Sequence, residues 1–381
     1  MTHAARSSTQ PRLAAPVRAI LVIALLYLFL AGIKLLESGI KGLGQGFTDA
    51  LFESVTNPLA GLFVGILATV LVQSSSVTTT TIIGMVAFNV IPIEAAVPMI
   101  MGANIGTTVT NTLVALANLR NADDFRRAFA AATMHDFFNV IAVSVLLPLE
   151  LLTKFLSGSA AWLAQTLSGQ SDLGADFNSP IKGAVSWLAA VLEAPLEALI
   201  SSERALAISF LLAGVGLIFL TLTFITKNMR LLVANRIEHT LNTVLAKSGL
   251  AGMLVGLVVT VAVQSSSITT SILIPLVASG VLLVRNAYPI TLGANIGTTI
   301  TGLLAALSTG AVSGLTIALT HTLFNIAGIV LIYTLPKTRY VPVLLAERLA
   351  DVATRRRWVA IVYVGGGFIA VPIIGVVFLT T

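Results

Sequence analysis

Long apolar segments, separated by shorter polar ones, recur along the whole chain. Each is close to the 20 or so residues that a helix needs to cross the hydrocarbon core of a bilayer. Because a helix satisfies all its backbone hydrogen bonds within one segment, this pattern predicts an all-α polytopic membrane protein. The expected spans cover residues 19–36, 93–117, 128–152, 206–225, 287–307, 314–335 and 359–379.

Two further apolar segments are interrupted by polar residues. Eight of the nine residues in 73–81 carry polar side chains, and residues 264–271 repeat the pattern. The apolar arm at 59–72 has 14 residues, and as a helix it reaches roughly 21 Å, which is too short to cross about 30 Å of hydrocarbon. We therefore predict two re-entrant helical hairpins, 58–90 and 251–281, that turn at the polar runs. The alternative is one long helix with a polar stripe.

Two of the expected spans contain the same seven residues, Gly-Ala-Asn-Ile-Gly-Thr-Thr, at 102–108 and at 293–299. Two glycines and an asparagine in the middle of an apolar segment favour unwound backbone. We therefore expect both spans, 93–117 and 287–307, to be broken helices.

The chain contains an internal repeat. The Gln-Ser-Ser-Ser run at 73–76 returns 191 residues later at 264–267, and the seven-residue string returns at the same offset. A sequence similar to His135–Asn139 recurs as His321–Asn325, at an offset of 186. Similarity among apolar residues does not produce identical polar strings, so the chain is duplicated. The predicted parts are a basic cytoplasmic tail at 1–18, a first repeat at 19–152, an extracellular linker at 153–204, a second repeat at 205–336, and a basic loop with a C-terminal span at 337–381.

Basic residues set the expected orientation. They gather near 1–18, 120–127, 227–247 and 337–357, and such stretches face the cytoplasm. The first hairpin then enters from outside and the second from the cytoplasm, so the repeats have inverted topology, as in secondary transporters. The inversion requires an odd number of membrane crossings, here three, between the two hairpins. The moderately apolar segment 181–200 is therefore expected to be an amphipathic surface helix and not a span.

Composition agrees with the membrane assignment and narrows the chemistry. Hydrophobic residues make up 56% of the chain and charged residues 10%, against about 25% charged in soluble domains. The net charge of +6 arises from residues that flank apolar spans, so it does not indicate nucleic-acid binding. Cysteine is absent, which excludes disulfides and Cys-ligated metals. Neither a Gly-x-Ser-x-Gly motif nor a P-loop occurs, so the chain is not expected to be an enzyme or an ATP-driven pump.

The repeated motifs bring neutral polar groups into the membrane. Helix N-termini favour anions, and carbonyl, hydroxyl and amide oxygens suit a hard cation such as sodium. These motifs contain no Lys or Arg, so co-bound cations would have to balance a bound anion. Asp136 is the acid clearly inside an expected span, and its counterpart is Thr322. An intramembrane acid is a functional candidate; the alternative is a carboxylate near the cytoplasmic end that pairs with Arg127.

The duplicated runs at 73–76 and 264–267, the duplicated Gly-Ala-Asn-Ile-Gly-Thr, and the segment 125–129 leading to 135–139 together resemble the type II sodium–phosphate cotransporters. The resemblance implies sodium-driven uptake of inorganic phosphate by alternating access at the plasma membrane. It implies an electrogenic member, because electroneutral members lack an acid at the position of Asp136. The linker of this chain lacks the cysteines that form a disulfide in animal members.

The resemblance also implies the site residues. The expected phosphate-binding residues are Gln73, Ser74, Ser75, Ser76, Gln264, Ser265, Ser266 and Ser267. The expected sodium ligands are Thr79, Asn104, Thr107, Thr108, Asp136, Asn139, Thr270, Asn295, Thr298, Thr299 and Asn325. The resemblance implies sodium ions as the coupling ions, and no cofactor is expected beside them. The expected partners are phosphate, sodium and the lipid bilayer, and one candidate assembly is a homodimer of independently working protomers.

Three alternatives stay open at this point. The first is a cotransporter of the same build for another oxyanion, such as sulfate or a dicarboxylate. The second is a channel. The third is an intramembrane enzyme that uses Ser74–Ser76 with His135, which the missing nucleophile motif disfavours.

Overall fold

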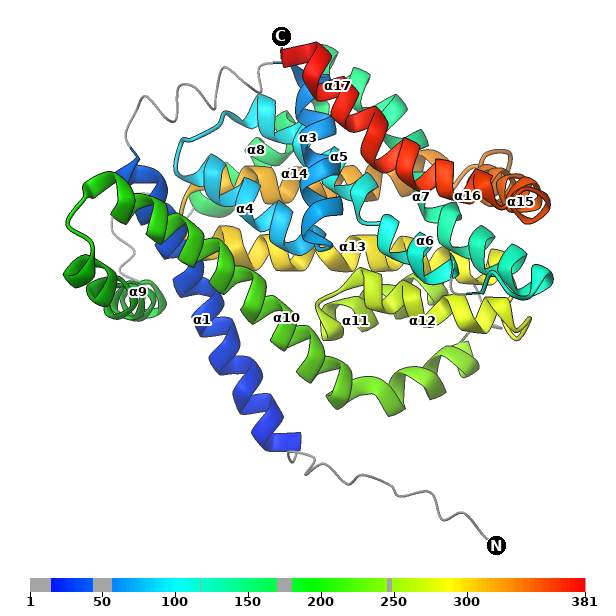
Figure 1. The fold of residues 1–381 in the computed structure, drawn as a ribbon, viewed down its shortest axis with the longest axis horizontal. Helices are drawn as coiled ribbons and strands as arrows, with labels where there is room; N and C mark the ends of the chain where they lie inside the picture. The colour runs from blue at the N-terminus through cyan, green and yellow to red at the C-terminus, as the bar shows by residue number, and fades with distance from the viewer. Residues whose placement is uncertain (1–14, 44–56, 117, 170–179, 245–248, 381) are drawn as a thin grey trace, which may run out of the picture.

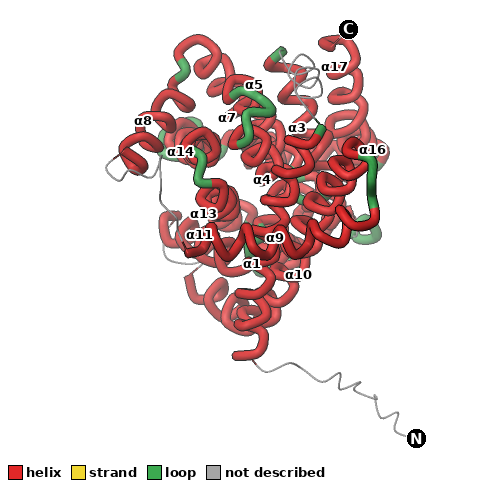
Figure 2. Tube along the Cα trace, turned by 90° about the vertical axis from the view of Figure 1, so that its left-hand side faces the viewer, coloured by secondary structure: helices red, strands yellow, loops and turns green. Residues whose placement is uncertain are grey.

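The computed structural model describes residues 15–43, 57–116, 118–169, 180–244 and 249–380. Within these residues every regular element is a helix, as Figure 2 shows. In this described part of the chain, seven helical segments are long and apolar enough to cross a membrane, and each overlaps one of the expected spans. They are α1 (Ala15–Gly42), α5 (Ile93–Gly106) with α6 (Val109–Leu116), α7 (Ala122–Thr153), the first part of α10 (Glu203–Val244), α13 (Val284–Thr309), α14 (Val312–Ile332), and α16 (Trp358–Val362) with η1 (Tyr363–Ala370) and α17 (Val371–Thr380). The prediction of an all-α polytopic membrane protein is confirmed.

Two helical hairpins occupy the segments with the polar runs. The first consists of α3 (Pro58–Val72) and α4 (Ser75–Ala87), and the second of α11 (Gly249–Val263) and α12 (Ser266–Ala278). Each pair is joined by two residues only, so neither polar run lies in one long helix. The helices are 13 to 15 residues long, and their re-entrant path through a bilayer stays a prediction.

Elements of the two repeats interleave in space (Figure 1). Helix α4 of the first hairpin packs against α13 and α14, and α12 of the second hairpin packs against α7. The first arm of each hairpin packs on the helix of its own repeat that carries the Gly-Ala-Asn-Ile-Gly sequence, α3 on α5 and α11 on α13. Helices α1 and α10 run side by side across the molecule. Each half therefore completes the packing of the other.

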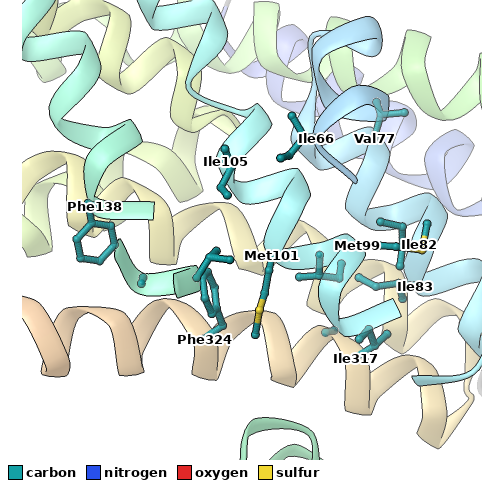
Figure 3. Packing of buried hydrophobic residues seen from close by; sticks show 14 of the residues in the cluster. Ile66, Val77, Ile82, Ile83, Met99, Met101, Ile105, Phe138, Ile317 and Phe324 are labelled. Carbon is teal, nitrogen blue, oxygen red and sulfur yellow. The ribbon is translucent and has the colours of Figure 1, made fainter. Parts of the chain in front are cut away.

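The apolar core joins both repeats. Figure 3 shows Ile66 of α3, Ile83 of α4 and Met101 of α5 in one buried cluster with Phe324 of α14. Phe138 of α7, which is equivalent to Phe324 in the repeat, belongs to the same cluster. Burial of this kind contributes about 1.5–3 kcal/mol per large side chain in water, whereas within a membrane close packing matters more than exclusion from solvent.

The predicted broken helices are found in one repeat only. Helix α5 ends at Gly106 and α6 begins at Val109, with Thr107 and Thr108 between them. In the second repeat α13 runs without interruption from Val284 to Thr309. The expectation of a broken helix at 287–307 is therefore wrong.

Close helix packing explains the glycines that had indicated unwound backbone. A Cβ atom on Gly102 would lie 2.0 Å from the carbonyl oxygen of Leu62 on α3. One on Gly293 would lie 1.8 Å from the carbonyl oxygen of Met253 on α11. Small residues allow two helix backbones to touch in this way. Both glycines are therefore needed for contact with the hairpin, and neither has to interrupt its helix.

Three further segments differ in detail from the expectation. The basic stretch 337–357 is not a loop, because most of it forms α15 (Val341–Arg355), which packs on α7. The last residues of the predicted tail belong to α1, and residues 1–14 lie outside the described part of the chain. The linker contains α8 (Phe155–Gly169) and α9 (Pro180–Leu199), and α9 is not among the seven segments fit to span.

Candidate functional site

The two hairpin turns have the same local geometry. Gln73 and Gln264 adopt left-handed backbone conformations, with φ of 56° and 57°. The next residue in each turn is a helix N-cap: the Ser74 side chain accepts a hydrogen bond from the N–H of Val77, and Ser265 accepts the equivalent bond, both at 3.3 Å. Serine is a favoured N-cap because its hydroxyl satisfies a free N–H of the first turn. The Gln-Ser pair therefore encodes the reversal of the chain.

The glutamine side chains tie each turn to a neighbouring helix. Each Nε2 donates to a main-chain carbonyl three residues earlier in its own hairpin. Each Oε1 accepts a hydrogen bond from a threonine hydroxyl, Thr110 for Gln73 at 3.2 Å and Thr301 for Gln264 at 2.8 Å. Both ends of each amide are thus engaged within the protein in this conformation. Direct contact of Gln73 and Gln264 with phosphate stays a prediction.

The remaining serines of the two runs begin the second arm of each hairpin. Ser75, Ser76 and Ser266 are buried, and Ser267 is half-buried. The N–H groups in the first turn of a helix have no acceptor within the helix, and that end carries a partial positive charge. The first turns of α4 and α12 therefore offer hydroxyl and N–H donors to an anion.

Four asparagines from four helices meet in the buried centre. Asn104 on α5 donates to the side chain of Asn325 on α14 at 2.6 Å, and Asn295 on α13 donates to that of Asn139 on α7 at 3.0 Å. Asn139 and Asn325 in turn donate to the main-chain carbonyls of Asn104 and Asn295, at 2.8 and 3.1 Å. Each bond has an equivalent in the other repeat, so the duplication extends to individual hydrogen bonds.

Two histidines complete this central network. His135 Nε2 lies 2.8 Å from the Oδ1 of Asn295, and His321 Nε2 lies 3.3 Å from the Oδ1 of Asn104. All six side chains are at most 3% exposed. The four asparagines expected to bind sodium are therefore brought together, but in this conformation their side chains bind one another and the histidines.

The threonines expected to bind sodium are buried and share one kind of bond. The hydroxyls of five of them donate to carbonyls of their own helical segment: Thr79, Thr107, Thr108, Thr298 and Thr299. A hydroxyl that donates its proton keeps lone pairs that can bind a cation. Their arrangement is compatible with the predicted role and leaves it untested.

Thr270 reveals a residue that the sequence did not single out. Its hydroxyl lies 2.8 Å from the Oδ1 of Asn111 on α6, and the hydroxyl of Ser271 lies 3.2 Å from the same oxygen. This contact joins the broken helix of the first repeat to the hairpin of the second. The residue equivalent to Asn111 is Gly302, so the duplication gave no signal for it.

Asp136 is fully buried, with 0% of its surface exposed. Its Oδ2 accepts a hydrogen bond of 2.8 Å from the hydroxyl of Tyr363 in η1. Its Oδ1 is buried and accepts no hydrogen bond from the described residues. Sequence reasoning missed Tyr363, because a single tyrosine in an apolar span carries no pattern that distinguishes it from a packing residue.

Two hairpins that end in capped polar turns, and a buried polar centre shared by duplicated halves, define a polytopic helical membrane protein built from two repeats. The chain belongs to the Na+/Pi-cotransporter family, whose sequence model matches residues 28–155 and 217–334. Those two segments contain both hairpins and all six residues of the central network.

Relatives are found among animal transport proteins. The chain is 36% identical over 421 residues to the sodium-dependent phosphate transport protein 2A of Rattus norvegicus, and 32% identical over 448 residues to the 2B protein of Homo sapiens. These alignments cover 92% and 93% of this chain but 66% and 64% of the relatives. The chain thus spans just under two thirds of their length. No solved structure matches it.

Replacing any asparagine of the central network is expected to lower the stability of the protein. Asn139→Leu leaves the amide of Asn295 and the carbonyl of Asn104 unpaired in a buried site, which should lower the free energy of unfolding by about 1–3 kcal/mol. Asn325→Leu should act alike because its bonds are equivalent. Thermal unfolding of the purified protein in detergent measures both. Ser144→Ala, at an exposed position of α7, is the control, and an Asn139→Leu midpoint equal to that of the control would contradict the prediction.

Proposed function

We propose that this chain is a sodium-coupled transporter that takes up inorganic phosphate across the plasma membrane by alternating access. The names of its relatives supply the substrate and the coupling ion. The repeated hairpin turn is the observation that carries the proposal for this chain's own residues. Each turn presents a serine-rich helix start, and its position is fixed by a glutamine–threonine hydrogen bond. A phosphate held between the two turns would meet donors from both repeats.

We further propose that the two repeats have inverted topology, with re-entrant hairpins and a cytoplasmic N-terminus. Contacts between basic stretches support this orientation. Arg126 on α7 forms an ion pair with Asp351 on α15, and Arg357 donates to the carbonyl of Leu119. The stretches near 120–127 and 337–357 therefore lie at one end of the molecule, as the positive-inside rule requires of two cytoplasmic segments.

Charge balance gives the proposed coupling. Divalent phosphate and the Asp136 carboxylate together carry about three negative charges, which roughly three sodium ions would neutralise in a site of low dielectric constant. Asp136 stays with the protein, so each cycle would move one net positive charge inward. Transport would then be electrogenic. The hydroxyl and amide oxygens of the threonines and asparagines are the remaining candidate sodium ligands.

Uptake by the purified protein in proteoliposomes tests the proposed function. We expect radiolabelled phosphate to accumulate only with an inward sodium gradient. Excess unlabelled phosphate should block the uptake, and equal sulfate or dicarboxylate should not. Uptake blocked equally by sulfate would assign another oxyanion, and downhill flux without sodium would indicate a channel. The same assay with a dilution series of monomeric and dimeric fractions tests whether protomers of a homodimer work independently.

The serines at the hairpin turns provide a direct test of the site. Ser75→Phe or Ser266→Phe would fill the first turn of α4 or α12 with an aromatic ring, so phosphate uptake should fall to the background of empty liposomes while the protein accumulates normally. Ser144→Phe, on an exposed face of α7, is the matched control. Normal uptake by both turn variants would show that phosphate binds elsewhere.

The role of Asp136 is tested by removing its charge. Asp136→Gly should still take up phosphate, but with one sodium ion fewer per cycle and without net charge movement, because phosphate alone then sets the charge to be balanced. Current measured together with tracer uptake gives the charge per phosphate, which should drop from about one to about zero. A current per phosphate like that of the unmodified protein would rule out this role.

A further inference from the structure

The seventh span lies outside both repeats and is largely unpacked. Only 11% of the 18 most apolar consecutive residues in Trp358–Thr380 are buried in the protein, against 78% for Ile93–Leu116. Residues such as Ile361, Ile374 and Phe378 are exposed at its surface, where lipid would surround them. A span with so little protein contact would pass for a simple anchor.

Tyr363 of this span contacts the buried carboxyl group of Asp136. Tyr363 donates its hydroxyl proton to Oδ2 of Asp136 at 2.8 Å. Its ring packs against Phe129 and Phe137 of α7 and against Phe368, with ring centroids 5.9 to 6.5 Å apart. These contacts hold the hydroxyl in place, so the hydrogen bond does not depend on a freely rotating side chain.

The backbone around Tyr363 is unusual. Residues Tyr363–Ala370 form a π-helical segment, and such segments occur frequently at functional sites. It contains three consecutive glycines, and a Cβ atom on Gly365 or Gly367 would meet nothing within 4 Å. Unlike Gly102 and Gly293, these glycines are not required by close packing. Their effect is on the helix itself, which they allow to widen where Tyr363 turns toward α7.

The bond to Tyr363 leaves Oδ1 of Asp136 without a donor. The hydroxyls of Thr108 and Thr112 lie within hydrogen-bonding range of the same carboxyl group, but in this conformation the protons of these hydroxyls are donated to the carbonyls of Ile105 and Thr108. Lone pairs of the two hydroxyls therefore remain next to a carboxylate oxygen. Such a set of oxygens repels an acceptor and suits a hard cation.

We infer that Tyr363 is a positioning residue for sodium: its hydroxyl fixes Oδ2 of Asp136, so that Oδ1 is presented to a cation beside Thr108 and Thr112. The terminal torsion of an aspartate is broad, and one strong hydrogen bond is enough to fix it. The seventh span thereby takes part in coupling, although it belongs to neither repeat. This inference rests on the proposed sodium-coupled transport.

Tyr363→Phe tests the inference, because it removes the hydroxyl and keeps the ring. We expect the sodium concentration for half-maximal uptake to rise about tenfold, in line with the loss of a hydrogen bond to a charged group. The half-saturating phosphate concentration, measured at saturating sodium, should change by less than about twofold. Both are measured in proteoliposomes, per mole of folded protein, as sodium and phosphate titrations of tracer uptake.

Two comparisons separate positioning from packing. Tyr288→Phe removes a buried hydroxyl that has no partner among the described residues, so it should leave the sodium titration unchanged. In the Asp136→Gly background Tyr363→Phe has no carboxylate to release, and its effect should shrink to less than about twofold. Each of three results would overturn the inference. The first is an unchanged sodium titration for Tyr363→Phe, and the second is an equal rise in the half-saturating concentrations of sodium and phosphate. The third is the same shift in the Asp136→Gly background as in the unmodified protein. Absence of sodium-dependent uptake by the unmodified protein would instead overturn the proposed function.

A second variant keeps the inference testable if Tyr363→Phe folds poorly. Replacing Tyr363 by a ring-fluorinated tyrosine keeps the hydroxyl and nearly the same ring volume while changing its strength as a donor. The half-saturating sodium concentration should then shift with the number of fluorine atoms. A titration that is independent of fluorination would count against a role for the hydroxyl.

Discussion

Pairing of buried amides across the two repeats is the constraint on which the rest of the structure depends. Amide groups cannot be left unpaired in the interior of a membrane protein, because no solvent replaces the missing partner. The side chain of Asn104 donates to that of Asn325, and the side chain of Asn295 donates to that of Asn139, so each bond joins one repeat to the other. Helices α5, α7, α13 and α14 are thereby held in one arrangement. The hairpins take their positions from this frame.

Glycine contacts transmit the frame to the hairpins. Gly102 on α5 and Gly293 on α13 let the first arm of each hairpin touch the frame helix at main-chain distance. Beyond these contacts, Gln73 accepts a hydrogen bond from Thr110 on α6, and Gln264 accepts one from Thr301 on α13, which fixes both turns. The two strings thus supply two of the four central amides and the close contacts, and the threonine that anchors each turn follows its string by two residues. These shared contacts explain why one string recurs unchanged in both halves, although its last two residues interrupt the helix in the first repeat and not in the second.

The sequence predicted the spans, the two turns and the gathering of the asparagines, because each depends on a local pattern or on the duplication. It could not decide whether the Gly-Ala-Asn-Ile-Gly strings break a helix. Glycine serves both unwinding and close packing. Both Gly102 and Gly293 pack closely on a hairpin, but the helix is interrupted in the first repeat and continuous in the second. Tyr363 and Asn111 were missed for another reason. Each acts through a tertiary contact, and neither has a polar counterpart in the other repeat from which its role could be inferred.

The places where the repeats differ are as informative as those where they agree. Asp136 is equivalent to Thr322 when the two repeats are aligned, and Asn111 is equivalent to Gly302. Both differences lie in or beside the broken helix of the first repeat, and Tyr363 contacts Asp136 from outside the repeats. A symmetric frame alone would treat its two halves alike. In the proposed cycle, the fully buried carboxylate of Asp136 on one side gives the frame a charge that the co-transported cations balance, so the asymmetry of the proposed coupling arises from the few residues that the duplication did not copy.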